Sequence, residues 1–157
     1  MQRTLLALTF LLLTAVTCLA GQHPVRVTRT ADDCYAAFDL DILIKTRFCS
    51  EQAFQEKALL RSGSFGELVF MDGTRCSVDT VYARTRLRRG THNVTVTREG
   101  EGVYRLAGSE RLLFASRCST LALRGEAVLE MQDSLSGILH LHGDTCRVEG
   151  VFEAISY

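Results

Sequence analysis

The sequence predicts a mainly β fold, all-β or α+β, built as an antiparallel sandwich or small barrel. Three observations predict it: alternation of apolar and polar residues, glycine turns between short apolar runs, and a repeated unit with two cysteines. Alternation with a period of two places every second side chain on one face of a strand, as expected where that face is buried. We therefore expect two similar disulfide-containing units, with one short helix.

The clearest strands follow two glycine turns. Cys76–Tyr82 follows Asp72-Gly73, and Cys146–Phe152 follows His142-Gly143. Such a pair between two apolar runs is a strong hairpin signal. Further strands are predicted over Val25–Thr28, Phe38–Lys45, Leu68–Met71, Asn93–Arg98, Val103–Leu106, Leu112–Ser116, Leu121–Leu123 and Ala127–Met131.

The one predicted helix lies in the first half of the chain. Ser50 is a suitable N-cap for a helix over Glu51–Arg61, which has acidic residues early, a basic end and Gly63 beyond it. These are the ordinary start and stop signals of a helix.

The chain resembles itself at an offset of about 70 residues. Gly73–Tyr82 aligns with Gly143–Phe152, and Cys49-Ser50 aligns with Cys118-Ser119. Because these matches occur in the same order, we interpret them as duplication of a unit of about 50 residues, over 35–84 and 104–154.

The cysteines follow the repeat. Cys49 and Cys76 are 27 residues apart, and Cys118 and Cys146 are 28 apart, so the simplest pairing is one bridge in each unit. Each bridge would contribute roughly 3–4 kcal/mol by restricting the unfolded chain. The rival pairing, Cys49 with Cys118 and Cys76 with Cys146, stays open.

Cys34 is the expected odd thiol, since the second unit has Val103 at the matching position. It would be free or joined to another chain. Asp32 and Asp33 beside it would raise its pKa, which argues against a catalytic thiolate.

Residues 1–20 have the pattern of a secretory signal peptide, with Arg3, an apolar run and small residues before Gly21. Lipidation of Cys18 is the alternative. The apolar run of about 12 residues is shorter than the roughly 20 that a transmembrane helix needs. We expect a secreted or periplasmic single β-rich domain over 21–157, without a transmembrane span.

Charge and motifs exclude several function classes. Loss of Arg3 leaves 17 basic and 18 acidic residues, so no overall field favours nucleic acid. The chain has no paired Cys-x-x-Cys zinc motif, glycine-rich phosphate loop or Gly-x-Ser-x-Gly turn. We expect no enzyme activity and no cofactor.

The strongest local charge feature is the run Arg84, Arg86, Arg88 and Arg89. If the strand that contains Tyr82 continued through it, three guanidinium groups would share one face. Guanidinium groups bind phosphate, sulfate and carboxylate in a bidentate manner. The partner would be another protein, an anionic glycan or a lipid head group. The alternative is an edge strand whose charge prevents aggregation.

His140 and His142 are weak candidates for metal ligands. A period of two would place both imidazole rings on one face of a strand. The repeat has Phe70 and Asp72 at the matching positions, so the fold does not require this pair, and we expect no metal site.

The leading hypothesis is an exported, non-enzymatic binding or inhibitor domain. The first alternative is a barrel that carries a small apolar ligand, and the second is a metal-dependent hydrolase using His140 and His142.

Overall fold

The computed structural model describes residues 21–63, 66–115 and 117–155, and this part of the chain is all β. The predicted signal peptide, Cys18 included, lies outside the described residues. No helix that could cross a bilayer occurs in the part described. The strands are β1 (Gln22–Ala31), β2 (Cys34–Ala37), β3 (Ile42–Arg47), β4 (Glu56–Arg61), β5 (Glu67–Phe70), β6 (Arg75–Thr85), β7 (Gly90–Gly100), β8 (Val103–Leu106), β9 (Arg111–Phe114), β10 (Gly125–Met131), β11 (Gly137–Leu141), β12 (Asp144–Val148) and β13 (Gly150–Ile155).

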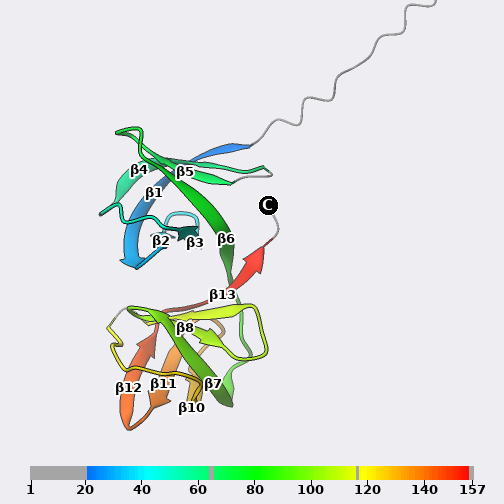
Figure 1. The fold of residues 1–157 in the computed structure, drawn as a ribbon. Coiled ribbons are helices and arrows are strands. Elements are labelled where there is room, and N and C mark those ends of the chain that lie inside the picture. The colour runs from blue at the N-terminus through cyan, green and yellow to red at the C-terminus, as the bar shows by residue number, and fades with distance from the viewer. Residues whose placement is uncertain (1–20, 64–65, 116, 156–157) are drawn as a thin grey trace, which may run out of the picture.

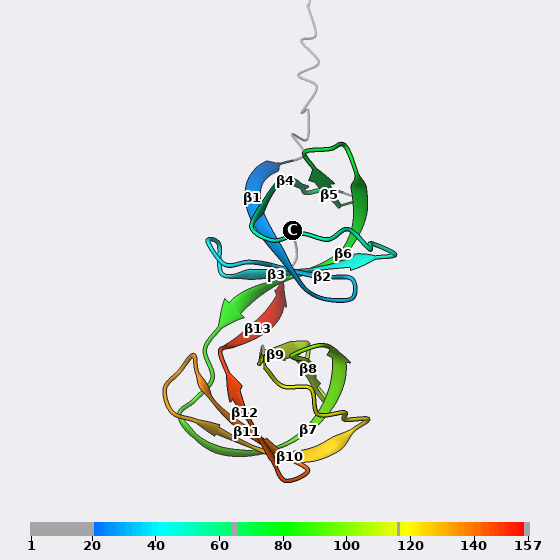
Figure 2. The ribbon, with the colours of Figure 1, turned by 90° about the vertical axis from the view of Figure 1, so that its left-hand side faces the viewer.

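The strands form two antiparallel barrels, which are seen as two lobes in Figures 1 and 2. In the first barrel the order is β1-β2-β3-β6-β5-β4, and β4 pairs back onto β1. In the second barrel β7 to β11 repeat this order, and β12 and β13 together take the place of β6. The predicted antiparallel β fold of two similar disulfide-containing units is thereby confirmed, and each unit closes into a barrel of its own.

The structural repeat is longer than the one seen in the sequence, because β1 and β7 also correspond. Ala58 and Ala127, 69 residues apart, occupy equivalent places in β4 and β10. Leu68 and Leu139 are then 71 apart, because the second connection between these strands is two residues longer. One consequence is that His140 corresponds to Val69, and not to Phe70 as the sequence alignment had it.

The interior of each barrel is organised around one tyrosine and one disulfide. The structure pairs Cys49 with Cys76 and Cys118 with Cys146, with Cα atoms 5.4 and 5.3 Å apart, so one bridge lies in each repeat as expected. The Tyr35 hydroxyl donates to the Glu51 carbonyl at 2.8 Å and lies 3.0 Å from Cys49 Sγ. Tyr104 makes the same contacts in the second barrel, at 2.8 Å with the Thr120 carbonyl and 3.1 Å from Cys118 Sγ.

The predicted helix over Glu51–Arg61 is wrong. Residues 48–55 form a loop without regular structure, and the rest is β4, in which Ala58 and Leu60 are buried and Lys57 is exposed. Contacts from elsewhere in the fold override the local helix signals. The Glu51 carbonyl accepts from the Tyr35 hydroxyl, and the Ala53 carbonyl accepts from the Arg29 amide, so neither is available to a helix.

Two strand predictions also need correction. In the predicted strand Phe38–Lys45, residues 38–41 form a turn, where Asp41 has a left-handed backbone with a φ of 52°, and the strand begins at Ile42. Leu121–Leu123 is not a strand, because it lies in the loop of the second barrel that corresponds to residues 48–55.

The barrels are joined by antiparallel pairing of β6 with β13, which are equivalent strands of the repeat. Val81 pairs with Ile155, and Thr85 pairs with Val151, so the register is unchanged when the two barrels are exchanged. This is the pattern of a twofold interface between identical subunits, here within one chain. A third apolar core fills the junction, separate from the two barrel interiors, and contains Cys34, Leu43, Tyr82, Leu112 and Phe152.

The buried tyrosine should be essential to each barrel. Tyr104→Phe leaves the Thr120 carbonyl without its donor, and we expect it to lower the free energy of unfolding by about 1–2 kcal/mol in urea titrations. Tyr82→Phe is the matched control, because that residue is also buried and its hydroxyl accepts a hydrogen bond of 3.4 Å from Arg105. Equal losses in the two variants would contradict the assignment.

Candidate functional site

Arg84, the first residue of the predicted arginine site, binds other residues of the chain and is not free to bind a partner. Its guanidinium donates to Asp41 Oδ1 at 2.9 Å and to the Glu149 carbonyl, and it lies 5.9 Å from the centre of the Phe152 ring. Asp41 belongs to the first barrel, whereas Glu149 and Phe152 belong to the second. Arg84 therefore helps to hold the barrels together.

The other three arginines lie on the connection between the barrels. The strand ends at Thr85, so the continuous strand face on which the prediction depended does not form. Arg86, Arg88 and Arg89 are exposed, and within the described residues their side chains make no ion pair or hydrogen bond.

The connection itself is held in place. The Leu87 amide donates to the Ser134 carbonyl at 2.9 Å, and its side chain packs against the core of the second barrel. The Arg88 carbonyl lies 2.7 Å from Nε2 of His92. Three free cationic groups thus project from a fixed backbone.

A second exposed surface is formed by two equivalent loops, which we call the first loop (residues 48–55) and the second loop (residues 117–124). Gln55 and Arg124 end them with left-handed backbones, at φ values of 50° and 57°. The Gln55 amide donates to Thr28 Oγ1 at 3.0 Å, and the Arg124 amide donates to Thr97 Oγ1 at 3.3 Å. Together with the disulfides and the tyrosine contacts, these bonds restrict both loops.

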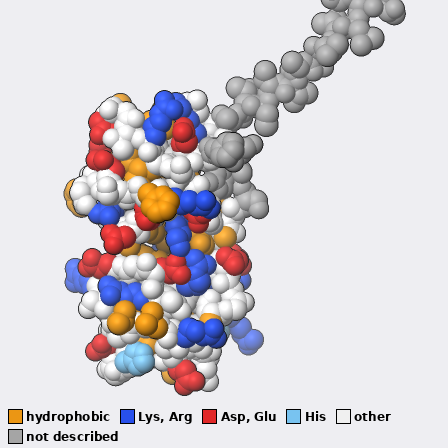
Figure 3. Space-filling model, in the orientation of Figure 1, with side chains coloured by type: hydrophobic (Ala, Val, Ile, Leu, Met, Phe, Trp, Pro, Cys, Tyr) orange, Lys and Arg blue, Asp and Glu red, His pale blue; other side chains and the backbone are white. Residues whose placement is uncertain are grey.

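Both loops expose large apolar side chains. The exposed fractions are 100% for Phe48, 82% for Phe54, 66% for Leu121 and 78% for Leu123. Figure 3 shows hydrophobic side chains on the surface of both lobes, with acidic and basic side chains gathered around the waist between them. Exposed apolar groups on a restrained backbone are typical of a binding surface.

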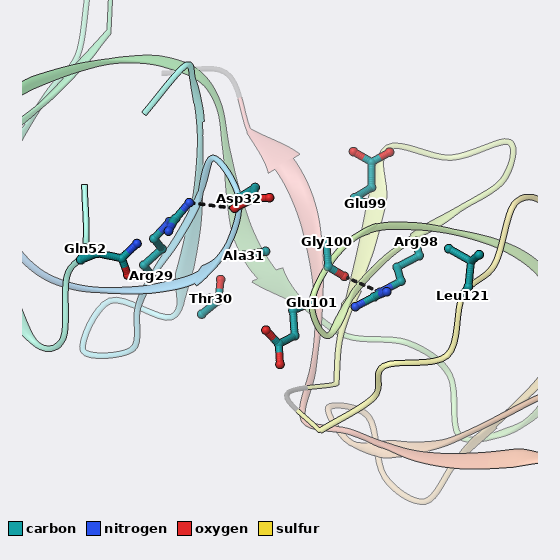
Figure 4. Close-up of a pocket in the computed structure, with 10 residues that line it drawn as sticks. All are labelled: Arg29, Thr30, Ala31, Asp32, Gln52, Arg98, Glu99, Gly100, Glu101 and Leu121. Atoms are coloured by element: carbon teal, nitrogen blue, oxygen red, sulfur yellow. Dashed lines mark hydrogen bonds and ion pairs between the residues drawn. The ribbon is translucent and has the colours of Figure 1, made fainter. Parts of the chain in front are cut away.

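An open groove of about 540 Å³ lies between the two loops at the junction of the barrels. Its ten lining residues form five equivalent pairs of the repeat, so the groove lies on the local twofold axis. Figure 4 shows side chains from both barrels around it. The pairs on its walls include Arg29 with Arg98, Asp32 with Glu101, and Gln52 with Leu121.

At the floor of this groove, Ala31 and Gly100 meet. A Cβ atom on Gly100 would lie 2.5 Å from that of Ala31, so the approach of β1 and β7 requires glycine here. The floor is therefore backbone and small side chains, and the charged groups stand on the walls.

Glu99 carries the main electrostatic contact between the barrels. Its carboxylate accepts from Lys45 of the first barrel at 2.6 Å and from Arg105 of its own barrel at 2.8 Å. The hydrogen bonds from Arg105 and Lys45 lower the pKa of Glu99 to about 2, against the effect of burial. The same contact raises the pKa of Arg105 above its usual range.

Cys34 is an unpaired thiol in the structure and lies in the apolar junction core, only 6% exposed. Burial raises the pKa of this thiol, so it stays protonated at neutral pH. A protonated, enclosed thiol is a poor nucleophile and is not accessible to another chain.

His140 and His142 do not form the predicted same-face pair. His140 is on β11 with Nε2 3.7 Å from Glu130 Oε2, but His142 lies in the β11–β12 turn with a φ of 53°. Within the residues that the structure describes, no group of three or more His, Cys, Asp or Glu side chains could hold a metal ion.

No protein-family model, curated protein or solved structure matches this chain. The function therefore has to be argued from its own surfaces. Sequence reasoning missed the loops and the groove. The available signal was the position of Phe48, Phe54, Leu121 and Leu123 close to the first cysteine of each unit, with Phe54 and Leu123 at equivalent places of the repeat.

Glu99→Gln should weaken the contact between the barrels. The pKa of Glu99 is depressed in the folded protein, so its contribution is present above the unfolded pKa of about 4.3 and is lost as the pH falls toward 2. We expect urea titrations at pH 7 to show a loss of about 1 kcal/mol relative to wild type, which disappears near pH 2.

Alkylation of Cys34 gives a second readout, since the thiol is reached only when the junction opens. Its rate at pH 7 should rise in Glu99→Gln and stay unchanged in Glu101→Gln, an exposed acid of the same groove without an ion pair in the described structure. An equal rate in all three proteins would show that Glu99 does not hold the barrels together.

Proposed function

We propose that this chain is an exported, non-enzymatic binding protein that contacts an anionic group of its partner through Arg86, Arg88 and Arg89. The observation that carries the proposal is the presence of three exposed guanidinium groups, unpaired within the described residues, on a connection whose backbone is anchored. The two disulfides indicate an oxidising compartment, in agreement with the signal-peptide pattern.

The anchored backbone is what makes the arginines suitable. Because Leu87 is held against the second barrel, its neighbours Arg86 and Arg88 extend toward solvent on either side of it. A fixed backbone lowers the entropy lost on binding. Phosphate, sulfate and carboxylate groups each accept two parallel hydrogen bonds from a guanidinium. The binding class thus includes acidic proteins, sulfated glycans and phosphate head groups.

The alternatives have less support in the geometry. A carrier of apolar ligands needs an open interior, but each barrel is filled by its own side chains, such as Leu68 in the first and Leu129 and Leu139 in the second. A metal-dependent hydrolase would need more ligands than His140 and His142. These two residues do not share a strand face, because His140 is on β11 and His142 lies in the turn that follows.

Heparin, a sulfated glycan, is a suitable first probe. We expect wild-type protein to bind a heparin column, and Arg86→Ala/Arg88→Ala/Arg89→Ala to elute at clearly lower salt because three contacts to sulfate are lost. The salt dependence of the affinity should also become flatter.

The matched control is Arg26→Ala/Lys57→Ala/Arg147→Ala, which removes three exposed charges from strands of both barrels. It should elute with wild type. Equal elution of wild type and the arginine variant would refute the proposed site, and an equal shift in the control would show that only net charge matters.

A further inference from the structure

The faces of the two barrels that border the groove carry opposite charge. Around the first loop are three carboxylates, Asp32, Asp33 and Glu51, and one guanidinium, Arg29. Around the second loop lie three guanidiniums, Arg98, Arg117 and Arg124, and one carboxylate, Glu101, besides Glu99, whose charge is balanced by Lys45 and Arg105. Arg29 and Asp32 correspond to Arg98 and Glu101, so these positions keep their sign of charge. The opposite excess charge comes from positions that are charged in one half alone: Asp33 and Glu51 correspond to Gly102 and Thr120, and Arg117 and Arg124 correspond to Phe48 and Gln55.

Apolar side chains lie at equivalent places within this charged surface. Phe54 of the first loop corresponds to Leu123 of the second, and both are more than three-quarters exposed. The residues directly before them, Ala53 and Ala122, are buried and fix the loops to their barrels. The surface therefore has an acidic half and a basic half, and each half presents an apolar group beside its charges.

Such a surface is complementary to itself. A twofold rotation that places the first loop of one molecule on the second loop of another brings opposite charges together at both contacts. The apolar groups would meet at the same time, and the two contacts would be identical, as in an isologous dimer. Like charges would meet if the molecules docked in the other orientation, which disfavours that arrangement.

We propose that this face binds a second copy of the same chain, with the first loop of each protomer against the second loop of its partner. Phe54 and Leu123 provide the apolar contact, and Glu51 of one protomer faces Arg117 and Arg124 of the other. The interface is separate from Arg86, Arg88 and Arg89, so this inference does not depend on the proposed function.

Sedimentation equilibrium of the exported wild-type chain tests the proposal directly. We expect a monomer–dimer equilibrium that weakens as the salt concentration rises. Phe54→Ser/Leu123→Ser should weaken dimerisation at least tenfold, whereas the Arg86, Arg88 and Arg89 variant should dimerise as wild type does. A wild-type monomer at all concentrations, or a loop variant that dimerises normally, would overturn the proposal.

Charge reversal identifies the partner of each loop. Arg117→Glu/Arg124→Glu makes both loops acidic, and Glu51→Arg/Gln55→Arg makes both basic. Arginine is compatible with the left-handed backbone at Gln55, because Arg124 has that conformation at the equivalent place. Each variant alone should be monomeric, and an equimolar mixture should recover the dimer. A mixture that stays monomeric, with both variants retaining wild-type thermal unfolding, would overturn this docking mode.

Discussion

Antiparallel pairing of β6 with β13 is the interaction on which the rest of the molecule depends. These are equivalent strands of a duplicated unit, and their register is the same from either barrel. The pairing brings Leu43 of β3 and Leu112 of β9 into one buried apolar core at the junction. It also encloses Cys34, brings Glu99 to Lys45, and creates the groove on the local twofold axis. Without it, the two barrels would each lack cover for an apolar outer face.

The two halves keep their internal contacts and differ on their surfaces. Tyr35 and Tyr104 hold a carbonyl and a disulfide sulfur in the same way, and Ala53 and Ala122 are buried alike. These contacts present the two loops on a rigid frame, so residues on the loops can change without loss of the fold. Phe48 and Arg117 occupy equivalent positions and differ completely in chemistry. Duplication followed by such divergence gives one chain two halves with the same frame and different surfaces.

The candidate site was only partly predictable. The arginine run was visible in the sequence, and three of its members are exposed as expected. Arg84 could not be assigned to the contact between the barrels in advance, because Asp41 and Glu149 are 43 and 65 residues away in the chain. The groove is likewise formed by segments about 70 residues apart, and the charges on its walls have meaning only once those segments meet. The helix over Glu51–Arg61 failed for the same reason, since distant donors from Tyr35 and Arg29 take its carbonyl groups.

The sequence by itself determined the β class, most strands and both hairpin turns, and it favoured one disulfide within each repeat over the pairing across the repeats. These follow from alternation with a period of two, from residues that tolerate a left-handed backbone, and from cysteine spacing, all of which are local or periodic properties. Only the tertiary structure decided that the two units close into separate barrels and that Arg84 and Glu99 join them. It also decided that Cys34 is enclosed. Those outcomes depend on contacts between residues far apart in the chain, and composition and periodicity carry no information about which distant surfaces will meet.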